Sequence, residues 1–282
     1  MNQVYQVAGI SKQAVHQYQK RKQLVVEHSS QLLEQAGRLR NSHPGAGCRK
    51  LALQLRCPGW GRDKVERLLL NNGYRVQYSP NYTRTTYRQR EYYYPNLIEG
   101  MELNDINQLV QTDITYYRVK DRFYYLTFII DVYSRYIAGY SLSTTLQADS
   151  NIRALKMLLK IRRISPDNRL IHHSDRGGQY IDKDYTRLLG DNNARISMCD
   201  AAWQNAYSER VNRTIKEEYL DGWSIGTYDQ LKVALDSAVR HYNQQRLHKS
   251  LGWVSPATFE QQLKRLDKSM YPKMKLYQLT NK

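Results

Sequence analysis

The apolar residues of this chain change from a helical to an alternating period near residue 108. Three successive segments then have the pattern of strands rich in Tyr, Ile, Val, Thr and Phe: VQTDITYYRV, FYYLTFIID and RYIAGYSL. The connections between them are short, which favours an antiparallel meander. Two further short strands, RLIHH and RISM, alternate with helical segments at about 147–162, 182–190 and 204–220.

This order, βββαβαβα, is that of a ribonuclease-H-like fold. Three antiparallel strands and two parallel ones would form one mixed five-stranded sheet with helices on both faces. The sequence therefore predicts an α/β domain of this type over residues 105–222.

Three carboxylates stand at distinctive places in this order. Asp113 lies within the first strand, Asp175 directly follows the fourth, and Glu209 lies in the last long helix. If the first and fourth strands are neighbours, their acids converge, and a helix on the sheet can bring the glutamate to the same point. Three hard oxygen ligands suit Mg²⁺ or Mn²⁺. Two such ions, about 4 Å apart, can activate the attacking oxygen and stabilise the leaving oxygen in a phosphodiester displacement.

The helix of Glu209 also carries candidate phosphate ligands. Asn205, Arg213 and Lys216 stand four residues before, four after and seven after the glutamate, so we expect one shared face. The alternative is an ordinary surface pair of Glu209 with Arg213, worth a few tenths of a kcal/mol. Together with the other two acids, the spacing favours a DNA-contacting face beside a metal site.

The charge distribution also points to a polyanionic partner. The chain has 43 Lys+Arg against 26 Asp+Glu, a net charge of +17. Residues 1–100 contain 16 Lys+Arg and 6 Asp+Glu, residues 101–220 contain 17 and 15, and residues 221–282 contain 10 and 5. Two basic ends around a nearly neutral centre favour a protein that holds nucleic acid with its ends and metal with its centre.

Composition excludes several other classes. With 41% apolar residues the chain can build cores, so a wholly disordered protein is excluded. No apolar run is long enough for a membrane helix, and the first residues do not have the pattern of a signal peptide. The three cysteines are odd in number and scattered, which fits a reducing cytosol. We therefore expect a cytoplasmic protein with no membrane partner.

Two small helical domains are expected before the core. Residues 1–40 have the pattern of a helix-turn-helix segment, whose second helix at about 12–20 would present Lys12, His16 and Lys20 to DNA. An ordinary helical hairpin is an equal alternative for this segment. Residues 41–77 predict a second helix-turn-helix-like domain, with helices at about 48–56 and 62–72 around Pro-Gly-Trp-Gly.

The remaining segments flank the core. Residues 78–104 are a Tyr- and Arg-rich linker, in which Arg84, Arg88 and Arg90 are candidate DNA contacts. An ordinary interdomain linker is the equal alternative. Residues 223–282 predict a helical extension, with one amphipathic helix at about 228–245 and another that opens at Ser255 and Pro256.

Some other residues could be mistaken for a site. Asp131 ends the second strand, and we interpret it as a turn residue. His172 and His173 precede Asp175, but no Cys or His pair stands at the spacing of a common zinc site. The 24 tyrosines show no cluster of Arg and His around one Tyr, as a tyrosine nucleophile would need.

With these motifs in order, the chain resembles the DDE transposases with an integrase-type core, specifically the OrfB product of the IS-three family of bacterial insertion sequences. The matching motifs are GCRKL (47–51), TDITYY (112–117), IDVYSR (130–135), HSDRGGQY (173–180), NAYSERVNRTIKEEYL (205–220) and YNQQRLHKSLGWVSPATFE (242–260).

The resemblance implies a catalytic triad of Asp113, Asp175 and Glu209 that uses a divalent metal to nick a transposon end and join its 3′-hydroxyl to target DNA. It also implies DNA contacts by Arg213 and Lys216, and a homo-oligomer on DNA in the bacterial nucleoid. An upstream reading-frame product is a further candidate partner, because the first helix-turn-helix looks truncated.

Three departures from the family pattern keep an alternative open. Residues 199–206 are about two residues short, Gln204 replaces a usual acid, and Val110 replaces a usual Trp. The alternative is a DNA-binding regulator or accessory subunit with a catalytically silent core. A ribonuclease-H-type nuclease is disfavoured, because it would not require two basic helical domains.

Overall fold

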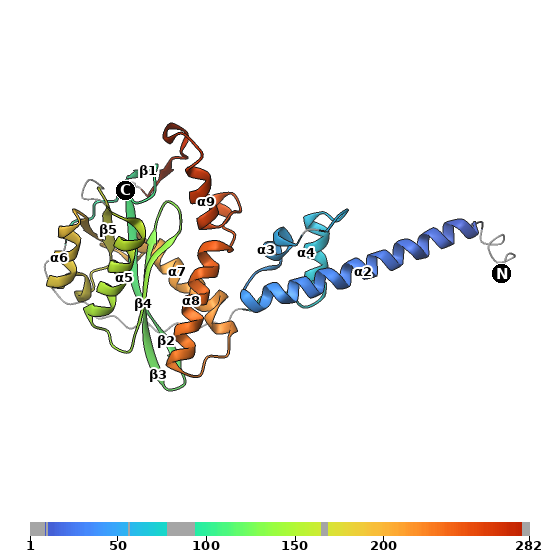
Figure 1. The fold of residues 1–282 in the computed structure, drawn as a ribbon, viewed down its shortest axis with the longest axis horizontal. Coiled ribbons are helices and arrows are strands. Elements are labelled where there is room, and N and C mark those ends of the chain that lie inside the picture. Colours follow the sequence, from blue (N-terminus) through green and yellow to red (C-terminus); the bar gives the residue numbers. More distant parts are fainter. Residues whose placement is uncertain (1–8, 10, 56, 78–93, 165–168, 278–282) are drawn as a thin grey trace. The chain divides into compact units, whose positions relative to one another are not determined.

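The computed structural model describes residues 9, 11–55, 57–77, 94–164 and 169–277. The chain divides into two compact units, Met1–Pro80 and Asn81–Lys282, which we describe separately (Figure 1).

The first unit is helical. Its elements are α2 (Lys12–Ser42), α3 (Cys48–Gln54) and α4 (Arg62–Asn71). Ser11 caps α2, and its hydroxyl accepts a hydrogen bond from the Ala14 amide at 3.1 Å. The core is formed by the C-terminal half of α2 together with α3 and α4, through Leu32, Ala36, Leu51, Val65 and Leu69 among others.

The helix expected at about 12–20 continues without a break to Ser42 as α2. No proline or glycine stands between residues 11 and 37, so nothing in the sequence ends the helix there. Most of the first helix of the expected helix-turn-helix, residues 1–8 and 10, lies outside the described residues.

The second unit is built on one five-stranded sheet. Its strands are β2 (Leu109–Val119), β3 (Arg122–Asp131), β4 (Ile137–Ser143), β5 (Ile171–Ser174) and β6 (Arg195–Met198). Their order is β4-β3-β2-β5-β6, with antiparallel pairing from β4 to β2 and parallel pairing from β2 to β6. This confirms the mixed sheet of the ribonuclease-H-like fold.

Helices cover both faces of the sheet (Figure 1). On one face, α5 (Ala148–Arg162) and α6 (Lys183–Asp191) pack through Leu155, Leu158 and Leu189. On the other, α7 (Ala206–Glu218) and α8 (Tyr228–Gln244) pack through Ile215, Leu235 and Val239, among others. Helix α8 was expected in a separate C-terminal extension. It belongs instead to the core of the sheet, because its apolar face packs against β3 and β4.

The last residues return to the start of the unit. Strand β7 (Met274–Lys275) pairs antiparallel with β1 (Glu102–Leu103). Ser255 and Pro256 open α9 (Pro256–Leu263) as expected, with the Ser255 hydroxyl accepting from the Thr258 amide at 3.2 Å. Short 3-10 helices complete the unit at Gly178–Tyr180, Ala202–Asn205, Leu220–Gly222, Lys249–Leu251 and Lys268–Met270.

None of the helices in the described part of the chain is both long and apolar enough to cross a lipid bilayer.

Candidate active site

The register of two parallel strands brings Asp113 and Asp175 to the same level of the sheet. The last paired positions of β2 and β5 are Gln111 and His173. Asp113 and Asp175 each follow two residues later, Asp113 within β2 and Asp175 just beyond β5. Both side chains are partly buried. This is the neighbour relation on which the predicted convergence depends.

The loop after β5 shapes the environment of Asp175. The Gly177 amide donates to Asp175 Oδ1 at 3.1 Å. A Cβ atom on Gly177 would lie 3.1 Å from the same oxygen and 3.0 Å from Gln179 Oε1. The glycine in HSDRGGQY therefore allows the backbone to approach the carboxylate and hold it by a hydrogen bond.

Polar side chains fasten the beginning of α7 to β2. The buried Gln111 amide donates to the Gln204 carbonyl at 3.0 Å and accepts from the Tyr207 amide at 3.0 Å. Asn205, also buried, donates to the Thr112 carbonyl at 2.9 Å. These bonds fix the start of the helix that carries Glu209.

Two further bonds fasten the middle and the end of α7 to the same strand. Asn212 Nδ2 donates to Asp113 Oδ2 at 2.7 Å, and Lys216 Nζ donates to Thr115 Oγ1 at 2.9 Å. Asn212 stands three residues after Glu209, so this helix contributes a carboxylate and also holds the carboxylate of the neighbouring strand.

The three acids act on one another electrostatically. Burial, together with the charges of Asp175 and Glu209, raises the pKa of Asp113 well above its usual value. Burial raises the pKa of Asp175, although the Gly177 amide opposes this. Burial also raises the pKa of Glu209, with Arg213 opposing the rise and Asp175 adding to it. The charges of Asp175 and Glu209 thus act on Asp113, and the charge of Asp175 acts on Glu209.

The donor set of this site fits a hard divalent cation. Within the described residues no three Asp, Glu, His or Cys side chains are close enough to hold one ion as they stand. Carboxylate and amide oxygens are nevertheless the ligands that Mg²⁺ prefers, and a cation would relieve the repulsion that raises the pKa of Asp113. The buried Asn212 Oδ1 also has no hydrogen-bond partner among the described residues.

The predicted DNA-contacting residues of α7 divide into two groups. Arg213 is exposed on the same helix as the exposed Glu209, as expected. Lys216 is partly buried and turned towards β2, and burial lowers its pKa. The expectation that Asn205 shares the exposed face is wrong, because residues Ala202–Asn205 form a 3-10 turn that directs this side chain into the core.

The other predicted DNA contacts lie away from these acids in the sequence. Lys12, His16 and Lys20 are exposed on α2 in the first unit. Arg84, Arg88 and Arg90 lie outside the described residues.

The residues that could be mistaken for ligands have structural partners. Asp131 is fully buried and accepts from the Asn107 amide at 2.7 Å and the Ser134 amide at 2.8 Å, which confirms its turn role. His172 Nε2 bonds the Tyr185 hydroxyl and His173 Nδ1 bonds the Ser197 hydroxyl, both at 2.8 Å.

Sequence reasoning missed Asn212, Gly177 and Gln111. Asn212 could have been found, because three residues after Glu209 places it on the same side of the helix. Gln111 gave no signal beyond a polar residue in an apolar strand, since its partners are 93 and 96 residues away.

Comparisons with known proteins show which family the chain resembles over most of its length. Two Integrase core domain families match residues 104–202 and 195–256. The insertion element IS600 uncharacterized 31 kDa protein of Shigella sonnei is 31% identical over 222 residues, which cover 76% of this chain and 81% of that protein. Transposase InsF for insertion sequence IS3A of Escherichia coli (strain K12) is 32% identical over 221 residues, 76% of each chain.

Solved structures of viral integrases are also similar. The HTLV-2 integrase catalytic core domain in complex with magnesium (dimeric form) is 18% identical, with a TM-score of 0.45 over 55% of this chain and 97% of that one. The simian T-cell lymphotropic virus intasome in complex with PP2A regulatory subunit B56 gamma is 15% identical, with a TM-score of 0.46 over 88% of this chain and 80% of that one.

Proposed function

Since the chain belongs to the integrase-core transposases of IS3-type insertion sequences, we propose that it binds insertion-sequence ends and catalyses metal-dependent DNA cleavage and 3′-hydroxyl strand transfer. The observation that supports this most is the mutual influence of Asp113, Asp175 and Glu209. Asp113 and Asp175 each follow the last paired position of neighbouring parallel strands by two residues, and Asn212, three residues after Glu209, donates to Asp113.

The three carboxylates would hold Mg²⁺, or Mn²⁺ in its place. The bound metal would activate the attacking oxygen and stabilise the leaving oxygen of the phosphodiester. Asn212 holds Asp113 on β2, and the Gly177 amide orients Asp175. The exposed Arg213 would contact a phosphate beside Glu209, while Lys216 keeps α7 on β2 and adds positive charge near Asp113.

The DNA partners would be transposon ends and target DNA, in the bacterial cytoplasm at the nucleoid. In this proposal residues 1–40 and 41–77 bind the ends, with Lys12, His16 and Lys20 of α2 among the contacts. In the linker of residues 78–104, Arg84, Arg88 and Arg90 would be further DNA contacts. The active species would be a homo-oligomer on DNA, with an upstream reading-frame product as a candidate fusion or partner.

Strand transfer by the full chain tests this function. The assay would join duplexes that carry the element's own ends to a supercoiled plasmid in Mg²⁺ or Mn²⁺. We expect Asp113→Asn, Asp175→Asn and Glu209→Gln each to reduce joining at least about 100-fold, because a bound metal contributes several kcal/mol to such a reaction. Asp191→Asn is the matched control, an exposed acid at the end of α6 that should leave joining unchanged.

The same assay tests the alternative of a regulator with a silent core. Wild-type protein that binds the ends but joins none would support that alternative, and joining that survives all three substitutions would refute the triad. The shortened segment 199–206 is well anchored, because Gln204 Oε1 accepts from the Asp200 amide at 2.6 Å and the Ala201 amide at 3.2 Å. Its departure from the family pattern therefore does not by itself favour a silent core.

A further inference from the structure

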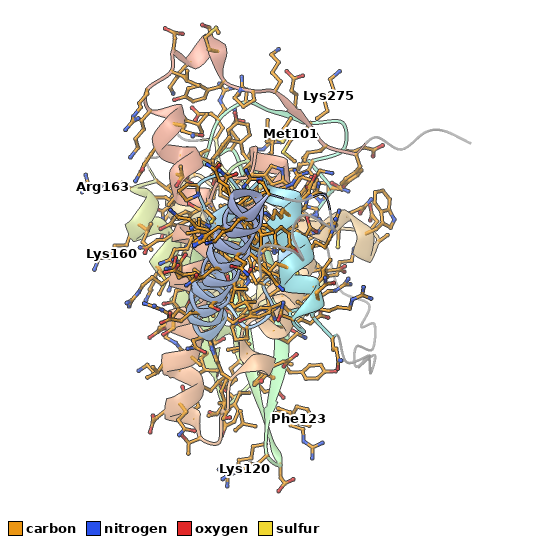
Figure 2. All side chains as sticks on the ribbon, turned by 90° about the vertical axis from the view of Figure 1, so that its right-hand side faces the viewer. Met101, Lys120, Phe123, Lys160, Arg163 and Lys275 are labelled. Carbon is orange, nitrogen blue, oxygen red and sulfur yellow. The ribbon has the colours of Figure 1, made fainter. Side chains whose placement is uncertain are left out.

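Helix α5 carries a row of cations on one side. Arg153, Lys156, Lys160 and Arg163 are spaced by three, four and three residues, which places them on one face of a helix. All four are exposed, and Arg163 is the residue that caps the C-terminal end of the helix. Figure 2 shows Lys160 and Arg163 projecting outward at the edge of the molecule. We call these four residues the α5 basic row.

The basic row has no acidic partner within the described part of the chain. None of its four side chains forms an ion pair with a described carboxylate, and the single acid of α5 is Asp149 in the first turn. The neighbouring Arg162 shows the contrast, because it turns inward and makes a bidentate pair with Glu260 at 2.7 and 2.9 Å. The fold thus neutralises the inward cation and leaves the row available to a ligand.

The row begins beside the candidate active site. Gln179, in the loop that follows Asp175, donates to the Leu146 carbonyl just before α5 at 3.3 Å. The Arg153 end of the row therefore lies nearer the acids, and the Arg163 end lies farther away. Helix α5 packs on the sheet face opposite α7, so the row is a surface separate from the one that carries Arg213.

We propose that the α5 basic row binds the phosphate backbone of target DNA, as duplex of any sequence. The proposal rests on the strand-transfer function proposed above. From Arg153 to Arg163 the row extends over ten residue steps, about 15 Å at the rise of an α-helix. Phosphates of one strand follow each other at about 3.4 Å along the DNA axis, so four cations match about four phosphates.

The chemistry of the row favours target DNA over the element's ends. Contacts from Lys and Arg to phosphates position a protein on DNA but carry no sequence information. The amide side chain of α5 that could read a base, Asn151, is fully buried. A surface of exposed Lys and Arg side chains is therefore suited to bind duplex DNA through its phosphates, independently of base sequence.

Salt dependence of DNA binding tests the proposal without any chemistry. Fluorescence anisotropy would measure binding of the full chain to an unrelated duplex in EDTA at several NaCl concentrations. Glutamine at all four positions should make the slope of log K against log salt shallower by about 3 to 4. Two half variants divide the row: one carries Arg153→Gln and Lys156→Gln, the other Lys160→Gln and Arg163→Gln. Each should make the slope shallower by about 2.

A matched variant removes equal charge elsewhere in the same unit. It carries glutamine at four exposed cations of the same unit that lie outside the basic ends and away from α5 and α7 in the sequence, namely Lys120, Arg122, Lys183 and Arg195. Its slope should change by less than about 1. An unchanged slope in the row variants, or an equal change in the matched variant, would overturn the proposal. Melting temperatures equal to that of the wild type would show that the variants are folded.

A second arm separates target DNA from the element's ends. The row variant should keep the wild-type preference for an end duplex over an unrelated duplex, and should join ends to a plasmid about tenfold less well at moderate salt. Loss of that preference would mean that the row reads the ends, against the proposal, and binding of an acidic protein but not DNA would also overturn it. If the protein shows the expected slopes but no strand transfer, the proposed function is contradicted, whereas DNA binding by the α5 basic row is not.

Discussion

Asp113 lies in an environment that destabilises its negatively charged form. Asn212 bonds it, but burial and two neighbouring acids favour its protonated form and raise its pKa. A group whose folded pKa is raised above its unfolded value contributes stability at low pH that is lost as the pH rises through the folded pKa. The charged Asp113 therefore destabilises the metal-free protein at neutral pH.

We predict that Asp113→Asn raises the melting temperature of the metal-free protein at pH 7.5, and raises it less at pH 4. Each kcal/mol of relieved repulsion should add about 2–4 °C for a unit of this size. Calorimetry in EDTA at both pH values measures the effect, with Asp191→Asn as the exposed control. An asparagine variant that melts below the wild type at neutral pH would contradict the electrostatic account.

Asn212 should act on metal binding through Asp113. We predict that Asn212→Ala weakens Mn²⁺ binding about 10–100-fold, as expected for a residue that orients a ligand, while the protein stays folded. Isothermal titration with Mn²⁺ measures it. Asn192→Ala is the control, since this residue bonds the Leu188 carbonyl at the end of α6. Equal affinity in both variants would show that Asn212 does not position the acid.

At the scale of elements, α7 is also held at its C-terminal end. Arg246, which follows α8, makes a bidentate pair with Glu218, the last residue of α7, at 2.6 and 2.8 Å. Both side chains are only 12% exposed. The family motif that begins YNQQR thus includes a residue that fixes the candidate catalytic helix.

Arg246→Ala should lower the free energy of unfolding by about 3–5 kcal/mol, because it removes the bidentate cationic partner of a buried carboxylate, Glu218. Adding Glu218→Gln should restore part of the loss. Urea denaturation gives both values. Arg187→Ala breaks the exposed pair with Asp184, 71% and 66% exposed, and should cost less than about 1 kcal/mol.

The elements of the second unit could be predicted because their signals are local. Strand periodicity predicted the five strands and their mixed pairing, and Ser255 with Pro256 predicted the start of α9. The site was predictable to the extent that it follows from that order, namely the placement of Asp113 and Asp175. The direction of Asn205 and Lys216 was not, because it depends on a 3-10 turn and on partners 93 and 101 residues away.

At the scale of the molecule, the main difference from the sequence-based expectation is where the sheet domain ends. The sequence suggested residues 105–222, but Leu231, Leu235, Val239 and Tyr242 of α8 cover one face of the sheet. Strand β7 then pairs with β1 at the beginning of the unit. The apolar pattern of α8 showed a helix, but it could not show which surface that helix would cover.

A fragment of residues 94–282 should therefore unfold in one cooperative transition. A fragment of residues 94–222 should aggregate or stay unfolded, because it exposes the sheet face that α8 covers. Expression of both fragments with the same tag, followed by circular dichroism and thermal melting, tests this. A stable, cooperative 94–222 fragment would show that α8 belongs to a separate domain.

The long helix α2 has a thermodynamic consequence for whatever the first unit binds. It spans 31 residues, about 46 Å, yet its buried residues are Leu32 and Ala36 in its C-terminal half. In its N-terminal half Tyr18, Leu24, Val25 and Val26 are exposed, so among the described residues this half gains little from packing. A helical segment of about 15 residues, the length of this half, is only marginally stable in water when it does not pack against other elements. Binding through Lys12, His16 and Lys20 would thus be coupled to helix formation, and its affinity would include the free energy of ordering this half.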